Sequence, residues 1–290
     1  MSSSSTSAAS SAPWALRGGV AVITGAAGGI GAALARALAA EGMHLALVDR
    51  NADSLATVAA DARASGVTVS THVLDVQDVA GCAALPAAVL AAHGRVTVLV
   101  NNAGVALGGR FDQVSAADFD WLMDINFQAP VRLTRAFLPR LSQQPAALLV
   151  QVSSIFGIVA PPGQTAYCAS KFALRGFSES LRHELAEAGS GVRVTLVHPG
   201  GVRTGIAAQA RVPDGAPPDE VAREQAAWNR LLVLTPEAAA RRIVQGMRVR
   251  EPRVLVGRDA EQATWVQRIF PVRYWALMAR DIARRVGRAA

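Results

Sequence analysis

The stretch that decides the fold is Thr24-Gly25-Ala26-Ala27-Gly28-Gly29-Ile30-Gly31. It follows an apolar, β-branched segment at 20–24 and opens an alanine-rich segment at 30–40 that is typical of a helix. Glycines let the backbone turn tightly and approach a pyrophosphate, and a helix N-terminus offers N–H groups and a positive dipole end. A plain strand–helix connection can look alike, but this position is the one that a dinucleotide-binding turn requires. The sequence therefore predicts a cofactor turn, whose binding residues are Gly25, Gly29, Ile30 and Gly31.

The same alternation of strand and helix patterns runs along most of the chain. Apolar strands are expected at 20–24, 45–48, 68–74, 96–100, 147–152, 192–197 and 253–256, with helical segments between them. Continuous apolar strands separated by helices indicate a parallel sheet covered on both faces. We therefore predict an α/β fold over residues 18–257: a single doubly wound, Rossmann-type domain with a parallel sheet of about seven strands flanked by helices.

Three segments depart from this alternation. Residues 1–17 are rich in Ser and Ala and predict a disordered tail. Residues 200–234 are rich in Pro and Gly, lack a strand, and predict a substrate loop. Residues 258–290 predict a basic, amphipathic, helical extension broken at Pro271. We favour packing of this extension on the protein, and leave open a lid over the substrate pocket or peripheral contact with an anionic membrane.

Composition limits the functional classes. The net charge is +7, and residues 241–290 hold twelve arginines against four acidic residues. No nucleic-acid module accompanies this basic segment, so no nucleic-acid partner is expected. The two cysteines have no metal-ligand spacing and no other cluster suggests a metal, so no metal site is expected. No secretory signal or membrane-spanning run is visible, which predicts a cytoplasmic protein.

The end of the second strand bears on the choice of cofactor. Asp49 lies 18 residues after Gly31, where a carboxylate accepts hydrogen bonds from the adenine ribose of NAD and repels the 2′-phosphate of NADP. Arg50 could pair with that phosphate, so NADP stays open, although we favour NAD. Asp75 and Val76, at the end of the third strand, are assigned to the adenine ring.

A tyrosine and the only lysine of the chain predict the chemistry. Tyr167 and Lys171 are four residues apart and share one face of an expected helix at 166–188. A neighbouring ammonium favours a phenolate and lowers the pKa of a tyrosine, which makes it an acid/base catalyst. Ser154, after the fifth strand, is placed to bond a substrate oxygen, with Ser153 as the rival for that role.

Polar residues also follow the fourth strand. Asn102, Ala103 and Gly104 lie at the edge of the sheet where a cofactor would bind, and we assign them to the cofactor. Asn126 falls inside the next expected helix, which a capping pattern at Ser115 opens. A polar amide there could bend the helix and hold a water molecule.

Together, these motifs resemble the short-chain dehydrogenase/reductase family over residues 18–257. The matching features are TGAAGGIG at 24–31, NNAG at 101–104, Asn126, Ser154, YCASK at 167–171 and HPGGVRT at 198–204. The resemblance implies that Tyr167 exchanges the substrate proton and that Lys171 binds the nicotinamide ribose. It further implies that Ser154 positions the substrate oxygen, that Asn126 anchors a relay water, and that the chain forms a homodimer or homotetramer. It assigns four residues to the nicotinamide side of the cofactor: Pro199, Gly200, Val202 and Thr204. His198 departs from the family, which usually has Asn there.

The predicted function is NAD(P)-dependent interconversion of a secondary alcohol and a ketone by hydride transfer. A hydrophobic or ring-containing substrate is expected because the loop at 200–234 carries apolar residues that could line a pocket: Ile206, Val212, Val221, Trp228, Leu231, Leu232 and Leu234. Two alternatives stay open. One is an NADPH-dependent reductase of 3-oxoacyl groups, and the other is a dinucleotide-binding sensor without turnover.

Overall fold

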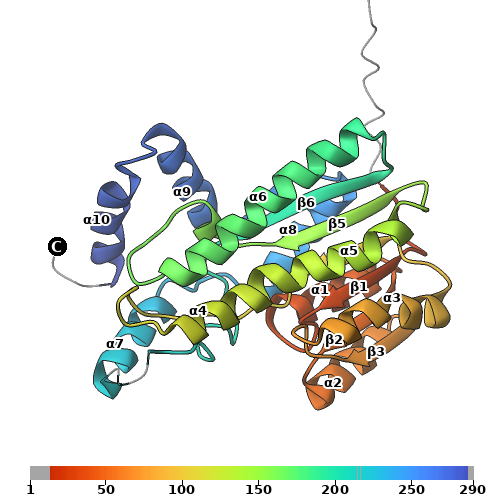
Figure 1. The fold of residues 1–290 in the computed structure, drawn as a ribbon, viewed down its shortest axis with the longest axis horizontal. Coiled ribbons are helices and arrows are strands. Elements are labelled where there is room, and N and C mark those ends of the chain that lie inside the picture. Colours follow the sequence, from red (N-terminus) through yellow and green to blue (C-terminus); the bar gives the residue numbers. More distant parts are fainter. Residues whose placement is uncertain (1–13, 214, 216, 287–290) are drawn as a thin grey trace, which may run out of the picture.

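The computed structural model describes residues 14–213, 215 and 217–286. Its centre is a seven-stranded sheet in the order β3-β2-β1-β4-β5-β6-β7, and every neighbouring pair is parallel (Figure 1). The predicted doubly wound α/β fold is confirmed. The strands are β1 (Val20–Thr24), β2 (His44–Asp49), β3 (Val69–Val73), β4 (Val98–Asn101), β5 (Ala147–Val152), β6 (Val192–Pro199) and β7 (Arg253–Val256).

Helices cover both faces of the sheet, and each layer has its own apolar cluster. One cluster joins the sheet to α1 (Gly29–Ala40), α2 (Ala52–Arg63) and α8 (Pro236–Arg248). The other joins it to α3 (Val79–His93), α5 (Ala129–Leu141) and α6 (Thr165–Glu187), and α5 and α6 cross the near side of the sheet in Figure 1. All residues of β1, β4 and β5 are buried, which explains why these strands are continuous apolar runs.

The helix expected after Ser115 is divided into three parts. Ser115 caps α4 (Ala116–Met123): its hydroxyl oxygen accepts from the Asp118 backbone N–H at 3.1 Å, as the capping pattern predicts. A π-helical turn, Asp124–Gln128, then connects α4 to α5. Such turns insert an extra residue into a helix and are frequent at functional sites. Asn126 lies in this turn.

One sequence-based boundary is wrong. The disordered tail was expected to reach residue 17, but Leu16 is buried and the Trp14 N–H donates to the Arg248 carbonyl at 2.6 Å. Residues 1–13 lie outside the described part.

The segment 200–234 has no strand, as expected, but it contains a helix that was not predicted, α7 (Pro218–Asn229), which begins with a proline at its first position. Isolated bridges join Val202 to Leu234 and Arg211 to Leu107.

After β7 the chain forms two further helices, α9 (Arg258–Ile269) and α10 (Tyr274–Val286), which lie together at one end of the molecule (Figure 1). Met278 and Tyr274 of α10 pack with Ile158, Val159 and Ala263. The Tyr274 hydroxyl accepts from the Ala160 backbone N–H at 3.0 Å. Within the described part of the chain, no helix is long and apolar enough to cross a membrane.

Candidate active site

The carboxyl ends of β1, β2, β4, β5 and β6 open on one cavity of about 1700 Å³. Most of the residues that the sequence assigned to the site line it: Gly25, Gly29, Ile30, Asp49, Arg50, Asp75, Val76, Asn102, Ala103, Gly104, Ser154, Tyr167, Lys171, Pro199, Gly200, Val202 and Thr204. Gly31 and Asn126 are not part of the lining. The topology explains this grouping, because ligands of open α/β sheets bind outside the carboxyl ends of the strands.

The glycine turn packs against the segment that follows β4 and is hydrogen-bonded to it. Gly25 has a φ of +64°, and a Cβ there would lie 2.8 Å from the Ala103 Cα. The Asn102 side-chain amide donates to the carbonyls of Thr24, at 2.9 Å, and Gly25, at 3.1 Å. A Cβ at Gly31 would overlap the Gly25 carbonyl oxygen. Gly31 therefore allows the turn and helix to pack closely, and its assignment to cofactor binding stays a prediction, since it does not line the cavity.

Asp49 and its neighbours surround the β2 end of the cavity. One Asp49 carboxylate oxygen accepts from the Ala27 backbone N–H and the other from that of Asn51, both at 3.0 Å. Asp49 therefore ties the glycine turn to β2 while it faces the cavity. Arg50 is largely exposed and its guanidinium lies 3.9 Å from the Asp75 carboxylate, a loose and solvent-screened pair.

The turn after β5 separates the two candidate serines. The Ser153 hydroxyl is buried and donates to the Lys171 backbone carbonyl at 3.1 Å, so it connects β5 to α6. Ser154 begins a 3₁₀ turn, Ile155–Gly157, and its hydroxyl accepts from the Phe156 N–H at 3.1 Å. A hydrogen bond from Ser154 also acts on the pKa of Tyr167. This geometry favours Ser154 over Ser153 as the serine that meets a substrate.

Tyr167 and Lys171 face the cavity from the first turns of α6. The Lys171 ammonium lies 5.7 Å from the centre of the Tyr167 ring and donates to the Val152 carbonyl at 3.3 Å. Lys171 is 3% exposed, although it is a residue type that is almost never buried without a partner. A buried lysine that meets a carbonyl, beside a tyrosine, is typical of a functional position.

The pKa of Tyr167 differs from the sequence-based prediction. Burial raises it to about 12, and the Ser154 hydrogen bond offsets only part of this increase. Burial also lowers the pKa of Lys171 to about 8. Loss of solvation disfavours the charged form of each group, and it is the largest cause of both pKa shifts. The predicted lowering of the tyrosine pKa is therefore wrong for the protein without cofactor. At neutral pH, Tyr167 is a proton donor.

Asn126 does not line the cavity but stabilises the segments around it. Its side chain is completely buried and exchanges two 2.9 Å hydrogen bonds with the backbone of Val105, the first residue after NNAG. Its second amide hydrogen is directed to the Ser170 hydroxyl at 3.2 Å. Both donors of this side chain are therefore used by the protein. The π-helical turn presents Asn126 where it joins the loop after β4 to α6.

His198, where the chain departs from the family, lies in β6 rather than in a loop. It is completely buried, and Nδ1 lies 2.7 Å from the Ser154 carbonyl oxygen. Because that oxygen can only accept, Nδ1 carries the proton. Burial lowers the pKa of His198 to about 4, so the ring is neutral at physiological pH. His198 thus fixes the backbone of Ser154 from β6 without adding a charge.

Asp259 is a site residue that sequence reasoning missed. It is the second residue of α9, and its carboxylate accepts from the Gly201 N–H at 2.6 Å. A Cβ at Gly200 would overlap this carboxylate, so the close approach requires glycine. The helices after β7 therefore hold the turn after β6. No local pattern could have shown this, because the contact joins residues 58 positions apart.

Apolar side chains form part of the cavity wall beside Tyr167, between polar residues of the same segments such as Gln209, Gln225 and Gln262. All seven residues of the 200–234 segment that were expected to line a pocket do so, which confirms that expectation. Phe156 packs edge-on against Tyr167, with ring centres 6.1 Å apart, and against Trp228 of α7 at 5.8 Å. Residues of α9 and α10 complete this wall, among them Val266, Trp275 and Met278. These apolar residues reach Tyr167, the candidate acid/base, through its contact with Phe156.

Known proteins resemble this chain in sequence and in fold. The family model described as short chain dehydrogenase matches residues 19–214. A Mycobacterium tuberculosis protein named as an oxidoreductase, SadH, is 41% identical over 267 residues, 92% of this chain and 96% of that one. A short-chain dehydrogenase/reductase from Burkholderia phymatum, solved with NAD, is 31% identical, with a TM-score of 0.80 over 88% of this chain and 95% of that one.

A second solved structure is an alcohol dehydrogenase from Thermococcus sibiricus, complexed with 5-hydroxy-NADP. It is 29% identical, with a TM-score of 0.70 over 82% of this chain and 94% of that one. The family model covers more than half of the chain, and the solved structures share the fold that carries the site. The chain therefore belongs to the short chain dehydrogenase family of oxidoreductases.

Proposed function

We propose that this protein is an NAD(P)-dependent oxidoreductase that interconverts a secondary alcohol and a ketone. The observation that carries the proposal is the convergence of Ser154, Tyr167 and Lys171 on the cavity that also contains the glycine turn. A proton-transfer group and a dinucleotide-binding turn in one cavity are what hydride transfer to a carbonyl requires.

The residues around the turn fit a dinucleotide. Helix α1 begins without a side-chain cap and without an acidic residue in its first turn, which suits a pyrophosphate at its N-terminus. Gly25, Gly29 and Ile30 would hold the pyrophosphate, Asp49 the adenine ribose, and Asp75 and Val76 the adenine. Thr204 and the Pro199–Val202 turn would hold the nicotinamide end. The bound nicotinamide supplies or accepts the hydride.

The protein residues would transfer the proton and stabilise the charges that form. Tyr167 donates it to the ketone oxygen during reduction and accepts it from the alcohol during oxidation. The Ser154 hydroxyl bonds the same oxygen and stabilises the charge that develops on it. The Lys171 ammonium binds the ribose hydroxyls and stabilises the phenolate during turnover. Asn126 would hold the loop after β4 against α6. A relay water would bind the second lone pair of the Asn126 side-chain oxygen or the Asn126 backbone.

The apolar side chains of the cavity wall beside Tyr167 support a hydrophobic substrate. Phe156, Trp228 and the apolar residues of the 200–234 segment form the wall beside Tyr167. Burial of apolar substrate surface contributes about 25 cal/mol per Å², so a larger apolar substrate should bind more tightly. The alcohol dehydrogenase name of the Thermococcus sibiricus relative supports the same reaction class.

The test is a panel of secondary alcohols and ketones of increasing apolar size, assayed with both NAD and NADP in each direction. Turnover is followed by the absorbance of the reduced nicotinamide. We expect kcat/KM to rise with apolar size. Tight cofactor binding without turnover on any substrate would instead favour a sensor.

Asp49 is expected to set the preference for NAD. Replacing it by Ser removes a negative charge from the place of the NADP 2′-phosphate, and Arg50 beside it is exposed and only loosely paired. We expect the ratio of kcat/KM for NADP to that for NAD to rise at least tenfold, since like charges held close cost roughly 1.4 kcal/mol or more.

The matched control for Asp49→Ser is Asp75→Asn, which removes a carboxylate from the same cavity at the end of the next strand. We expect it to change the cofactor ratio by less than about threefold, within the range of a screened surface charge. Equal shifts in the two variants would show that net charge, rather than Asp49, selects the cofactor.

The two directions of the reaction are expected to respond to pH in different ways. Oxidation needs the Tyr167 phenolate, whose pKa is raised to about 12, and the Lys171 ammonium, whose pKa is lowered to about 8, so the oxidation rate should rise with pH up to about 8 and level off above it. Reduction needs the phenol and the Lys171 ammonium, whose pKa is lowered to about 8, so it should fall above pH 8. Initial rates in both directions, as kcat/KM against pH, check this. Profiles of the same shape would contradict it.

A further inference from the structure

The junction of α9 and α10 carries a cluster of exposed apolar side chains. Twelve large apolar side chains are exposed in the described part of the chain, and five of them lie within residues 265–277. They are Trp265 (63% exposed), Ile269 (61%), Phe270 (47%), Val272 (89%) and Leu277 (46%), and we name them the apolar corner. Single exposed apolar residues are ordinary, but a cluster of this size on one corner marks an interaction surface.

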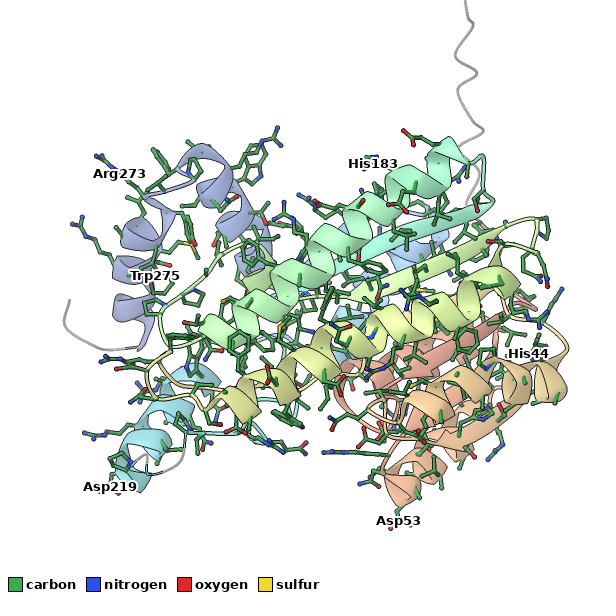
Figure 2. The ribbon with its side chains drawn as sticks, viewed as in Figure 1. His44, Asp53, His183, Asp219, Arg273 and Trp275 are labelled. Carbon is green, nitrogen blue, oxygen red and sulfur yellow. The ribbon has the colours of Figure 1, made fainter. Side chains whose placement is uncertain are left out.

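The apolar corner is surrounded by arginines. Arg268, Arg273 and Arg280 are exposed beside it, and Figure 2 shows Arg273 at the outer edge of the helix pair. Residues 258–281, whose side chains the structure describes, contain four arginines and three acidic residues. One of those acids, Asp259, faces inward to the Gly201 N–H. The surface next to the apolar corner is therefore positively charged, which matches a negatively charged partner.

The apolar corner includes the turn between the two helices and adjoins the cavity. Residues 270–273 form the turn between the two helices, and Val272 in this turn is the most exposed of the large apolar residues. Leu277 is exposed on the corner and lines the cavity as well, together with Val266, Trp275 and Met278. The helix pair thus presents apolar side chains both to the cavity and to solvent.

We propose that the apolar corner docks on an anionic lipid bilayer. Aromatic and aliphatic side chains at a helix–helix turn would enter the boundary between headgroups and acyl chains, and the flanking arginines would meet anionic headgroups. A second copy of the chain is a poorer partner, because an isologous contact places the same patch on both sides and would bring Arg268 and Arg273 toward their counterparts. This proposal does not depend on the proposed reaction.

The test uses the full-length protein and extruded vesicles. We expect co-sedimentation with vesicles of equal parts phosphatidylcholine and phosphatidylglycerol. Vesicles of phosphatidylcholine alone should bind much less, and raised salt should weaken binding. Trp265 provides an internal probe: its fluorescence should be quenched by brominated lipids, and Trp265→Phe should remove most of that quenching. Absence of binding to the anionic vesicles would overturn the proposal.

Paired variants distinguish lipid docking from non-specific adsorption and from contact between copies of the chain. Arg268→Gln with Arg273→Gln should lower the vesicle partition coefficient roughly thirtyfold, at about fivefold per arginine near an anionic surface. Val272→Ser should lower it by at least threefold. The matched control is Val73→Ser, since Val73 is 63% exposed on the edge strand β3, far from α9 and α10 (Figure 1).

Two outcomes would overturn the proposal in these variants. One is an equal loss of vesicle binding in Val73→Ser and Val272→Ser, which would mean non-specific adsorption. The other is a fall in the sedimentation coefficient of Val272→Ser without vesicles, which would assign the corner to contact between copies. Circular dichroism of each variant checks the fold, and lipid quenching of the unaltered protein stands independently of the substitutions.

Discussion

Replacing Tyr167 by Phe is expected to lower kcat for ketone reduction roughly 10³-fold, the middle of the range for loss of a general acid. This corresponds to about 4 kcal/mol of transition-state stabilisation. The change removes only the hydroxyl, so the edge-on contact of the ring with Phe156 remains. Cofactor binding, measured by fluorescence titration, should change by less than about threefold. The loss should therefore appear in kcat rather than in cofactor affinity.

The chain offers a matched control for this substitution, because it has only two tyrosines. Tyr274→Phe makes the same chemical change on α10 and removes the acceptor of the Ala160 N–H. We expect it to lower kcat by less than about tenfold. It also leaves Tyr167 as the only titrating phenol, so tyrosinate absorbance in this variant reports the pKa of Tyr167, which should lie far above 10. Similar losses of kcat in the two variants would reject Tyr167 as the acid.

The sheet and the cavity edge could be predicted from the sequence because both depend on local patterns. A strand buried on both faces must be a continuous apolar run, and β1, β4 and β5 are such runs. Parallel strands bring their carboxyl ends to one edge, so residues that follow those strands had to meet there. Tyr167 and Lys171 share a helix face by spacing alone. These inferences need no knowledge of which helix packs on which.

What the sequence could not provide depends on contacts between distant segments. The direction of the Tyr167 pKa shift follows from how deeply α6 buries the phenol, and no spacing rule gives that depth. The bond from His198 to the Ser154 carbonyl depends on the pairing of β5 with β6. Asp259 reaches Gly201 only because α9 folds back over the end of β6. The helix α7 was missed because its Pro-rich start resembles a loop.

These long-range contacts share one consequence for the site. His198 from β6 and Asp259 from α9 each bond a backbone group of a turn that follows a strand, and Ser153 bonds the backbone of Lys171 in α6. Turns after strands are otherwise the least restrained part of such a domain. The backbone that carries the candidate residues is thus positioned by buried side chains from other elements. Positioned groups of this kind lose less entropy when a substrate binds.

Lys171→Met is the second substitution from which we expect a large effect. Methionine has nearly the same length and shape, so the variant removes a buried charge without leaving a cavity. Because the ammonium is 3% exposed and donates to one carbonyl, the fold should be no less stable, and thermal unfolding checks this. We expect kcat/KM to fall roughly 10²-fold to 10³-fold, because the phenolate that forms during turnover loses the cation beside it.

The matched control for Lys171→Met is Lys171→Arg. The chain has one lysine among 29 basic residues, and a Cβ at Gly104 would lie 3.4 Å from its ammonium nitrogen, so the surrounding space is narrow. Lys171→Arg keeps the charge but presents a wider, planar group, and we expect this variant to retain less than a tenth of the original kcat/KM.

A single lysine also makes the pKa directly measurable. Protein labelled with ¹³C at lysine Cε should give one side-chain NMR signal, and it should titrate near pH 8 because burial lowers the pKa of Lys171. The sign follows from burial, which disfavours the charged form. A midpoint at the ordinary value of about 10.4 would mean a solvated ammonium, and Lys171 would then lack the environment that the proposed chemistry requires.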